Sequence, residues 1–130
     1  MITGIFIAAP EGHQWALRIE EFESALQQRF PDVRTATRHS PVTGNRALDF
    51  DVEINGEDVW GSYVDRTNLV LAEGEPSLWA ESVTWFLSLL PDDASAVAMV
   101  EANPDEVAPV RRDANADSIT LLLESLCERA

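Results

Sequence analysis

The chain has 130 residues, of which 45% are hydrophobic and four are tryptophan, so it is long enough for one domain with its own core. Its formal net charge of −14 disfavours binding to nucleic acids or anionic membranes, which carry charge of the same sign. The single cysteine, Cys127, excludes an internal disulfide, and the lack of a Cys/His cluster argues against a structural zinc site. We therefore expect a soluble, cytoplasmic, single α+β domain over residues 1–130.

The excess negative charge is concentrated in the middle of the chain. Residues 47–110 contain fourteen Asp and Glu against one Arg, a net charge of −13. Residues 1–46 are neutral overall, and residues 111–130 carry −1. A field of this sign attracts cationic partners.

The first two predicted elements are a strand and a helix. Ile2–Ala9 is apolar on both faces and has no preceding Lys or Arg, which predicts a central strand rather than a signal peptide. Pro10–Gly12 is expected to open a helix that ends at Pro31, because proline disfavours helix at the residue before it. The apolar stripe of this helix consists of Trp15, Ile19, Phe22, Leu26 and Phe30.

A group of strands follows. Val33–His39 is a predicted strand, and residues 40–45 a loop. Arg46–Ile54 alternates between apolar and polar side chains, and Glu57–Val64 is its predicted partner. The intervening Asn55-Gly56 is a strong hairpin signal, because both positions of a type I′ turn need positive φ.

The remaining pattern predicts two helices separated by a short strand. The order is β-α-β-β-β-(β)-α-β-α, which is typical of an α+β two-layer sandwich: a mostly antiparallel sheet with helices packed on one face. The elements are an optional strand at Asn68–Ala72, a helix from near Pro76 to Leu90, a strand at Ala96–Glu101, an irregular connection over Asn103–Asp117 and a helix at Ala116–Glu128.

The predicted hairpin carries an acidic face. Strand alternation places Asp49, Asp51 and Glu53 on one side, with successive side chains about 6.5–7 Å apart. The two-residue turn sets Glu53 opposite Asp58 and Asp51 opposite Trp60. Because like charges directly opposite each other destabilise a sheet, this hairpin needs compensation.

Two interpretations of this face remain open. The first is a solvated sheet face that is partly neutralised within the molecule; if the preceding strand pairs with His39 opposite Arg46, it places Arg34 opposite Asp51 and Arg38 diagonal to Asp49, where their charges relieve the repulsion. The second is a partner-binding surface in which Trp60 serves as an apolar anchor inside a charged rim.

A calcium site is not supported by the same segment. Asp51-x-Glu53-x-Asn55-Gly56 is similar to the opening of an EF-hand loop. However, Asp58 stands where an apolar residue is expected, and Ser62 where the bidentate Glu must be. No metal site is assigned.

Few other residues suggest chemistry. Glu101 ends an apolar strand, where it could act as a general acid or base in a pocket or could simply mark the point at which the strand reaches solvent. His13 and His39 are expected at the surface or at caps, and neighbouring His39 and Ser40 point to opposite faces, so they cannot form a dyad. Cys127 is expected to be a small core residue.

The sequence therefore favours a small acidic binding protein without enzymatic activity, whose acidic sheet face engages a basic protein partner. In size and charge, though in no motif, it is similar to small acidic proteins that neutralise nucleic-acid-directed toxins. One alternative is an enzyme or small-molecule-binding protein with a pocket at Glu101, and another is a self-associating structural subunit. No catalytic residue or cofactor is assigned, and the predicted partner-binding residues are Asp49, Asp51, Glu53, Asp58 and Trp60.

Overall fold

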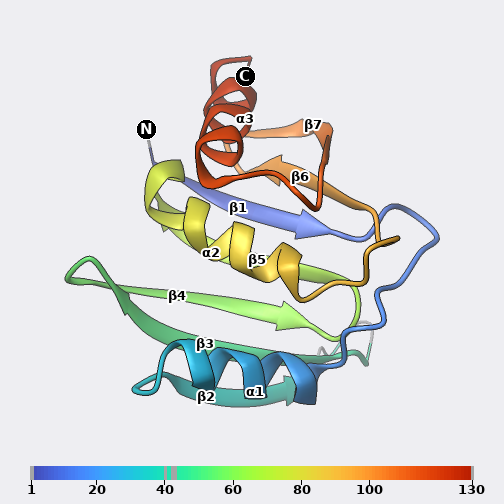
Figure 1. Cartoon of the computed structure of the whole chain (residues 1–130), viewed down its shortest axis with the longest axis vertical. Coiled ribbons are helices and arrows are strands. Elements are labelled where there is room, and N and C mark those ends of the chain that lie inside the picture. The colour runs from blue at the N-terminus through green and yellow to red at the C-terminus, as the bar shows by residue number, and fades with distance from the viewer. Residues whose placement is uncertain (1, 40, 42–43, 130) are drawn as a thin grey trace.

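The computed structural model describes residues 2–39, 41 and 44–129. Over these residues, three helices accompany a seven-stranded sheet (Figure 1). The strand order is β2-β3-β4-β5-β1-β6-β7, and all neighbouring strands are antiparallel. In chain order, the elements are β1 (Thr3–Ala8), α1 (Ile19–Arg29), β2 (Arg34–His39), β3 (Arg46–Ile54), β4 (Glu57–Val64), β5 (Asn68–Gly74), α2 (Pro76–Ser88), β6 (Ala96–Val100), β7 (Asn103–Val110) and α3 (Ala116–Glu128).

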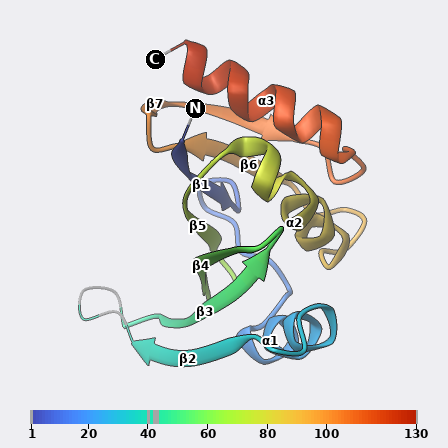
Figure 2. The same ribbon diagram turned by 90° about the vertical axis from the view of Figure 1, so that its left-hand side faces the viewer.

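The helices lie on one side of the sheet (Figure 2). Helix α1 contacts β3 and β4, α2 contacts β5 and β1, and α3 contacts β6 and β7. Alternate strand positions point toward these helices, and their apolar side chains form the core, as the alternating pattern of Arg46–Ile54 predicted. The predicted α+β two-layer sandwich is confirmed.

The β3–β4 hairpin has the predicted register. Asn55 and Gly56 adopt positive φ angles of 53° and 82°. The turn pairs Glu53 with Asp58 and Asp51 with Trp60. The predicted loop over 40–45 lies partly outside the described residues, at positions 40, 42 and 43.

The predicted start of the first helix was wrong. The chain from Ala9 to Arg18 is not helical, and α1 begins at Ile19. This segment forms hydrogen bonds with the β4–β5 turn instead: the Ala9 N–H donates to the Thr67 carbonyl at 2.8 Å, and the Ile19 N–H donates to Asp65 Oδ1 at 2.9 Å. Backbone groups held by a distant turn cannot enter the helical ladder, so the helix starts where Asp65 satisfies its first N–H.

The irregular connection predicted after the sixth strand was also wrong in part, because residues 103–110 form β7. The segment contains Pro104 and Pro109, which suggested a loop. Strand β7 lies at the edge of the sheet and pairs only with β6 among the described strands, so a proline without an N–H removes no bond from a second neighbour.

Replacing Asn115 with Ala is expected to lower the free energy of unfolding by about 1 kcal/mol. The Asn115 side chain caps α3, since its Oδ1 accepts hydrogen bonds from the Ser118 N–H and hydroxyl, each at 2.8 Å. Urea unfolding followed by circular dichroism measures the loss. Asn115→Asp, which keeps the accepting oxygen, is the control and should retain most of the stability; an equal loss in both variants would contradict the capping role.

Candidate binding face of the sheet

The side of the sheet that none of the described helices covers is called the open face (Figure 2). The strand pairings place side chains from alternate positions of β2, β3, β4, β5, β1 and β6 on this face. They include Arg34 and Arg38; Asp49, Asp51 and Glu53; Asp58, Trp60 and Ser62; Val70 and Ala72; Phe6; and Val97 and Met99. Gly4, which has no side chain, also borders this face.

The acidic end of the open face lies on β3 and β4. Asp51, Glu53 and Asp58 are exposed, and Glu53 is directly opposite Asp58. Within the described part of the chain, none of these three carboxylates forms an ion pair or a hydrogen bond. Arg34 is opposite Asp51 in the register, as predicted, but no ion pair joins their side chains. Within the described residues, no cationic side chain pairs with these carboxylates, so the repulsion between Glu53 and Asp58 is not relieved.

Asp49 differs from the other predicted carboxylates because it is already paired. Arg38 Nε donates to its two oxygens at 2.9 and 3.1 Å, which confirms the predicted diagonal placement. The Ser62 hydroxyl donates to Asp49 Oδ1 at 2.5 Å. Asp49 thus links three strands and is less available to a partner than Asp51 or Glu53.

Trp60 is the exposed aromatic residue of the open face. Its side chain is 57% exposed, compared with 3% for Trp15 and 1% for Trp79. The indoles of Trp15 and Trp79 also donate hydrogen bonds to the carbonyls of Ser95 and Ala72. These two tryptophans are core residues, whereas Trp60 presents its ring to solvent.

A hollow of about 360 Å³ lies beside Trp60 on the open face. Small residues leave this space, because Gly4 on β1 and Ala72 on the neighbouring β5 cover little of the sheet. The lining consists of Gly4, Phe6, Asp58, Val59, Trp60, Val70, Leu71, Ala72, Glu73 and Glu101.

Glu101 reaches this hollow from the end of β6. Its N–H donates to the Gly4 carbonyl at 2.9 Å. A Cβ atom placed on Gly4 would lie 3.5 Å from Glu101 Cβ and 3.6 Å from its Oε2, so the Glu101 side chain lies over the glycine. The structure thus brings Glu101 together with Asp58 and Trp60, residues that the sequence assigned to two separate candidate sites.

Sequence reasoning missed Gly4, Phe6 and Glu73 as parts of this hollow. For Phe6, the sequence did contain a signal, because Ile2–Ala9 is apolar on both faces. It leaves Phe6 on the open face, while Ile5 and Ile7 are fully buried beneath the helices. Glu73 lies at the register shift between β1 and β5, which takes it out of the simple alternation of β5, so the sequence pattern gave no signal for it.

A second hollow, of about 440 Å³, lies between the end of α1 and the acidic end of the open face. It is lined by residues 29–34 together with Asp51, Val52, Glu53 and Asp58. Arg29 lies 5.5 Å from the ring centroids of both Phe30 and Trp85, so its guanidinium already makes cation–π contacts within the molecule. The lining has mixed charge and favours no particular ligand.

The other residues considered for chemistry have ordinary surroundings. His13 and His39 are exposed, as predicted. Cys127 is buried, and burial raises the pKa of its thiol, which disfavours the nucleophilic thiolate. Among residues 2–39, 41 and 44–129, no three His, Cys, Asp or Glu side chains are grouped closely enough to hold a metal ion.

None of the described helices is long and apolar enough to cross a membrane. No protein-family model, curated protein or solved structure matches the chain.

Proposed function

We propose that this chain is a binding protein without enzymatic activity and that its open face engages a basic protein partner. The observation that carries the proposal is the exposed Trp60 beside Asp51 and Asp58, two carboxylates that have no partner in the described part of the molecule. An aromatic anchor surrounded by charge supplies both buried apolar area and electrostatic attraction.

The charge distribution supports the same proposal. The segment with a net charge of −13 contains all of β3 except its first residue, Arg46, together with β4 and β5, and these strands form the acidic and aromatic part of the open face. Glu53 and Asp58 repel each other across the hairpin, and an approaching cationic surface reduces this repulsion. The electrostatic energy therefore favours association. The proposed partner is therefore a protein with a cluster of Arg or Lys side chains.

Reversing the charge of Asp51 and Glu53 to Lys is expected to weaken capture of the basic partner by at least about tenfold, since two favourable charge contacts become repulsive. The measurement is a pull-down from native lysate of the source cells with immobilised chain, washed at graded salt. Capture by the unaltered chain should fall as salt screens the attraction, and the double variant should show a much flatter salt dependence.

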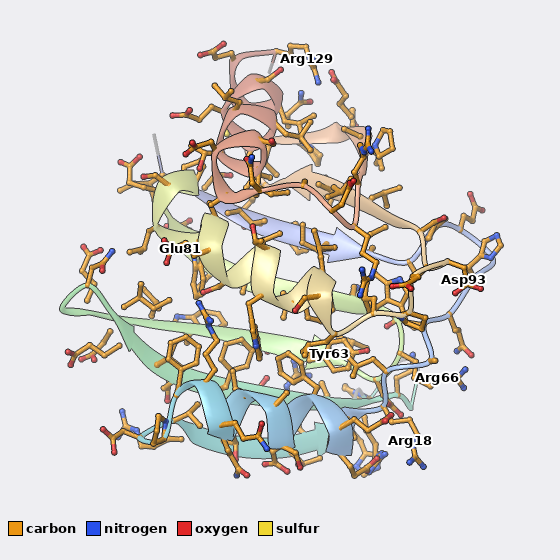
Figure 3. The ribbon with its side chains drawn as sticks, viewed as in Figure 1. Arg18, Tyr63, Arg66, Glu81, Asp93 and Arg129 are labelled. Carbon is orange, nitrogen blue, oxygen red and sulfur yellow. The ribbon has the colours of Figure 1, made fainter. Side chains whose placement is uncertain are left out.

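The matched control reverses Glu81 and Asp93, two exposed carboxylates on the helical side and in the loop that follows α2 (Figure 3). This control changes the net charge equally but leaves the open face intact. Equal loss of capture in both double variants would show that capture depends on the overall net charge and not on the open face. Unchanged capture by the Asp51/Glu53 variant would remove the acidic end of the open face from the proposal.

The hollow at Glu101 favours a second candidate function, that of a small-molecule-binding protein or an enzyme. Its volume of about 360 Å³ lies at the lower end of the range of ligand pockets, and aromatic and charged side chains converge on it. A thermal-shift screen with a metabolite panel tests this candidate. Stabilisation by a metabolite that is lost in Glu101→Gln would support it over the protein partner, and the absence of any shift would count against it.

A further inference from the structure

We infer that the hollow between Trp60 and Glu101 receives one arginine side chain of the basic partner. The inference rests on the proposed function and adds to it the chemical group that is recognised. Its basis is the combination of an exposed indole, a floor of small residues and carboxylates that have no other partner.

The carboxylates around the hollow determine the charge of its occupant. Asp58, Glu73 and Glu101 line it from β4, β5 and the end of β6. None of them forms an ion pair or a side-chain hydrogen bond with the described residues. Because no cation of this part of the chain neutralises them, a cationic group from outside is the complementary occupant.

The shape of the hollow selects an extended cation over a metal ion. Within residues 2–39, 41 and 44–129, these carboxylates are not grouped closely enough to coordinate one ion. The space between them is lined instead by Trp60, Phe6 and Val70. A long side chain with an apolar stem and a charged head fits such a lining, because its methylene groups contact the apolar residues while its head reaches a carboxylate.

Two features favour arginine over lysine. A planar guanidinium can stack on the face of the Trp60 indole, which gives a cation–π contact. It can also donate two parallel hydrogen bonds to the Glu101 carboxylate, which lies over Gly4 at the floor of the hollow. A lysine ammonium is a compact point charge and cannot make both contacts in the same way.

The test uses the full chain and three capped tripeptides, Gly-Arg-Gly, Gly-Lys-Gly and Gly-citrulline-Gly. Citrulline is the neutral counterpart of arginine and preserves its shape. Nuclear magnetic resonance can follow the four indole N–H groups separately, and Trp60→Phe assigns the Trp60 signal. We expect a saturable shift of this signal with the arginine peptide and roughly tenfold weaker binding of the citrulline peptide, the loss typical of a charge-assisted hydrogen bond.

Two variants examine the floor and the carboxylate. Glu101→Gln removes the charge, and Gly4→Val fills the hollow; both should weaken the arginine peptide about tenfold or more. Glu81→Gln, which alters an exposed carboxylate of α2, is the control and should bind normally. Retained folding of each variant is checked by circular dichroism.

Equal binding of the arginine and citrulline peptides, or unchanged binding in Glu101→Gln, would overturn the inference. Preference for the lysine peptide would also overturn it. These results are distinguishable from a failure of the proposed function. If a basic partner is captured through Asp51 and Glu53 but no arginine binds in the hollow, the proposed function holds and this inference fails. If arginine binds in the hollow but no protein is captured, the proposed function fails.

Discussion

Replacing Phe22 with Ala is expected to lower the free energy of unfolding by about 3–5 kcal/mol. Phe22 lies on α1, is fully buried and joins the two layers of the fold. Its ring stacks on Tyr63 of β4 with the centroids 4.6 Å apart, and it lies 5.8 Å from Phe50 and 6.0 Å from Phe86. Its removal leaves a cavity bordered by rings from β3, β4 and α2, which cannot all move inward to fill it.

Urea unfolding followed by circular dichroism measures this loss. Leu121→Ala is the control, because Leu121 on α3 is 68% exposed and its truncation should change the free energy of unfolding by no more than about 0.5 kcal/mol. If Phe22→Ala lowers the free energy of unfolding no more than Leu121→Ala does, α1 is not packed against the sheet through Phe22.

Alkaline solution is expected to unfold the protein in a transition that coincides with ionisation of Tyr63. Burial raises the pKa of this phenol well above its ordinary value of about 10, and the negative charge of Asp65 raises it further. The hydroxyl also donates to the Leu17 carbonyl at 2.6 Å from within the core, between the sheet and α1 (Figure 3). The native state therefore holds the phenolic proton more tightly than the unfolded chain does.

This difference fixes the direction of the pH dependence. The contribution of Tyr63 to the free energy of unfolding is fully present below about pH 10 and decreases as the pH rises above that value, because only the unfolded chain then releases the proton. Tyr63 is the single tyrosine of the chain, so phenolate absorbance reports this residue alone. Absorbance and circular dichroism should change together; phenolate formation near pH 10 in a fully folded protein would contradict the buried hydrogen bond.

Tyr63→Phe provides the control for this titration. It should remove the absorbance change entirely. It should also cost about 1–3 kcal/mol at neutral pH, because the buried Leu17 carbonyl loses the hydrogen bond from Tyr63. A variant as stable as the original chain at neutral pH would show that this hydrogen bond contributes little.

Part of the candidate site could be predicted because it depends on local rules. The Asn55-Gly56 turn sets the register of its two strands, and that register places Asp51 opposite Trp60 and Glu53 opposite Asp58. The alternation of β3 then determines which side chains face away from the helices. The acidic end of the open face was therefore accessible from the sequence.

The hollow beside Trp60 was not accessible in the same way. It exists because β1 pairs with β5 on one side and β6 on the other, which brings Glu101 over Gly4 and toward Trp60. No periodicity within a segment encodes that strand order. The contacts of Asp49 were predictable only in part. The strand register predicted that Arg38 lies near it, but the hydrogen bond from Ser62 became visible only in the side-chain geometry.

The amino-acid sequence by itself determined the elements with strong periodicity, the hairpin register, and the separation of an apolar face from an acidic one, because these follow from interactions between residues close in the chain. Only the tertiary structure decided that residues 9–18 remain non-helical, that 103–110 form an edge strand, and that Glu101 joins Trp60. Each of these outcomes depends on hydrogen bonds or contacts with a distant segment, such as the Asp65 carboxylate at the start of α1, and such contacts override local preference once the chain has folded.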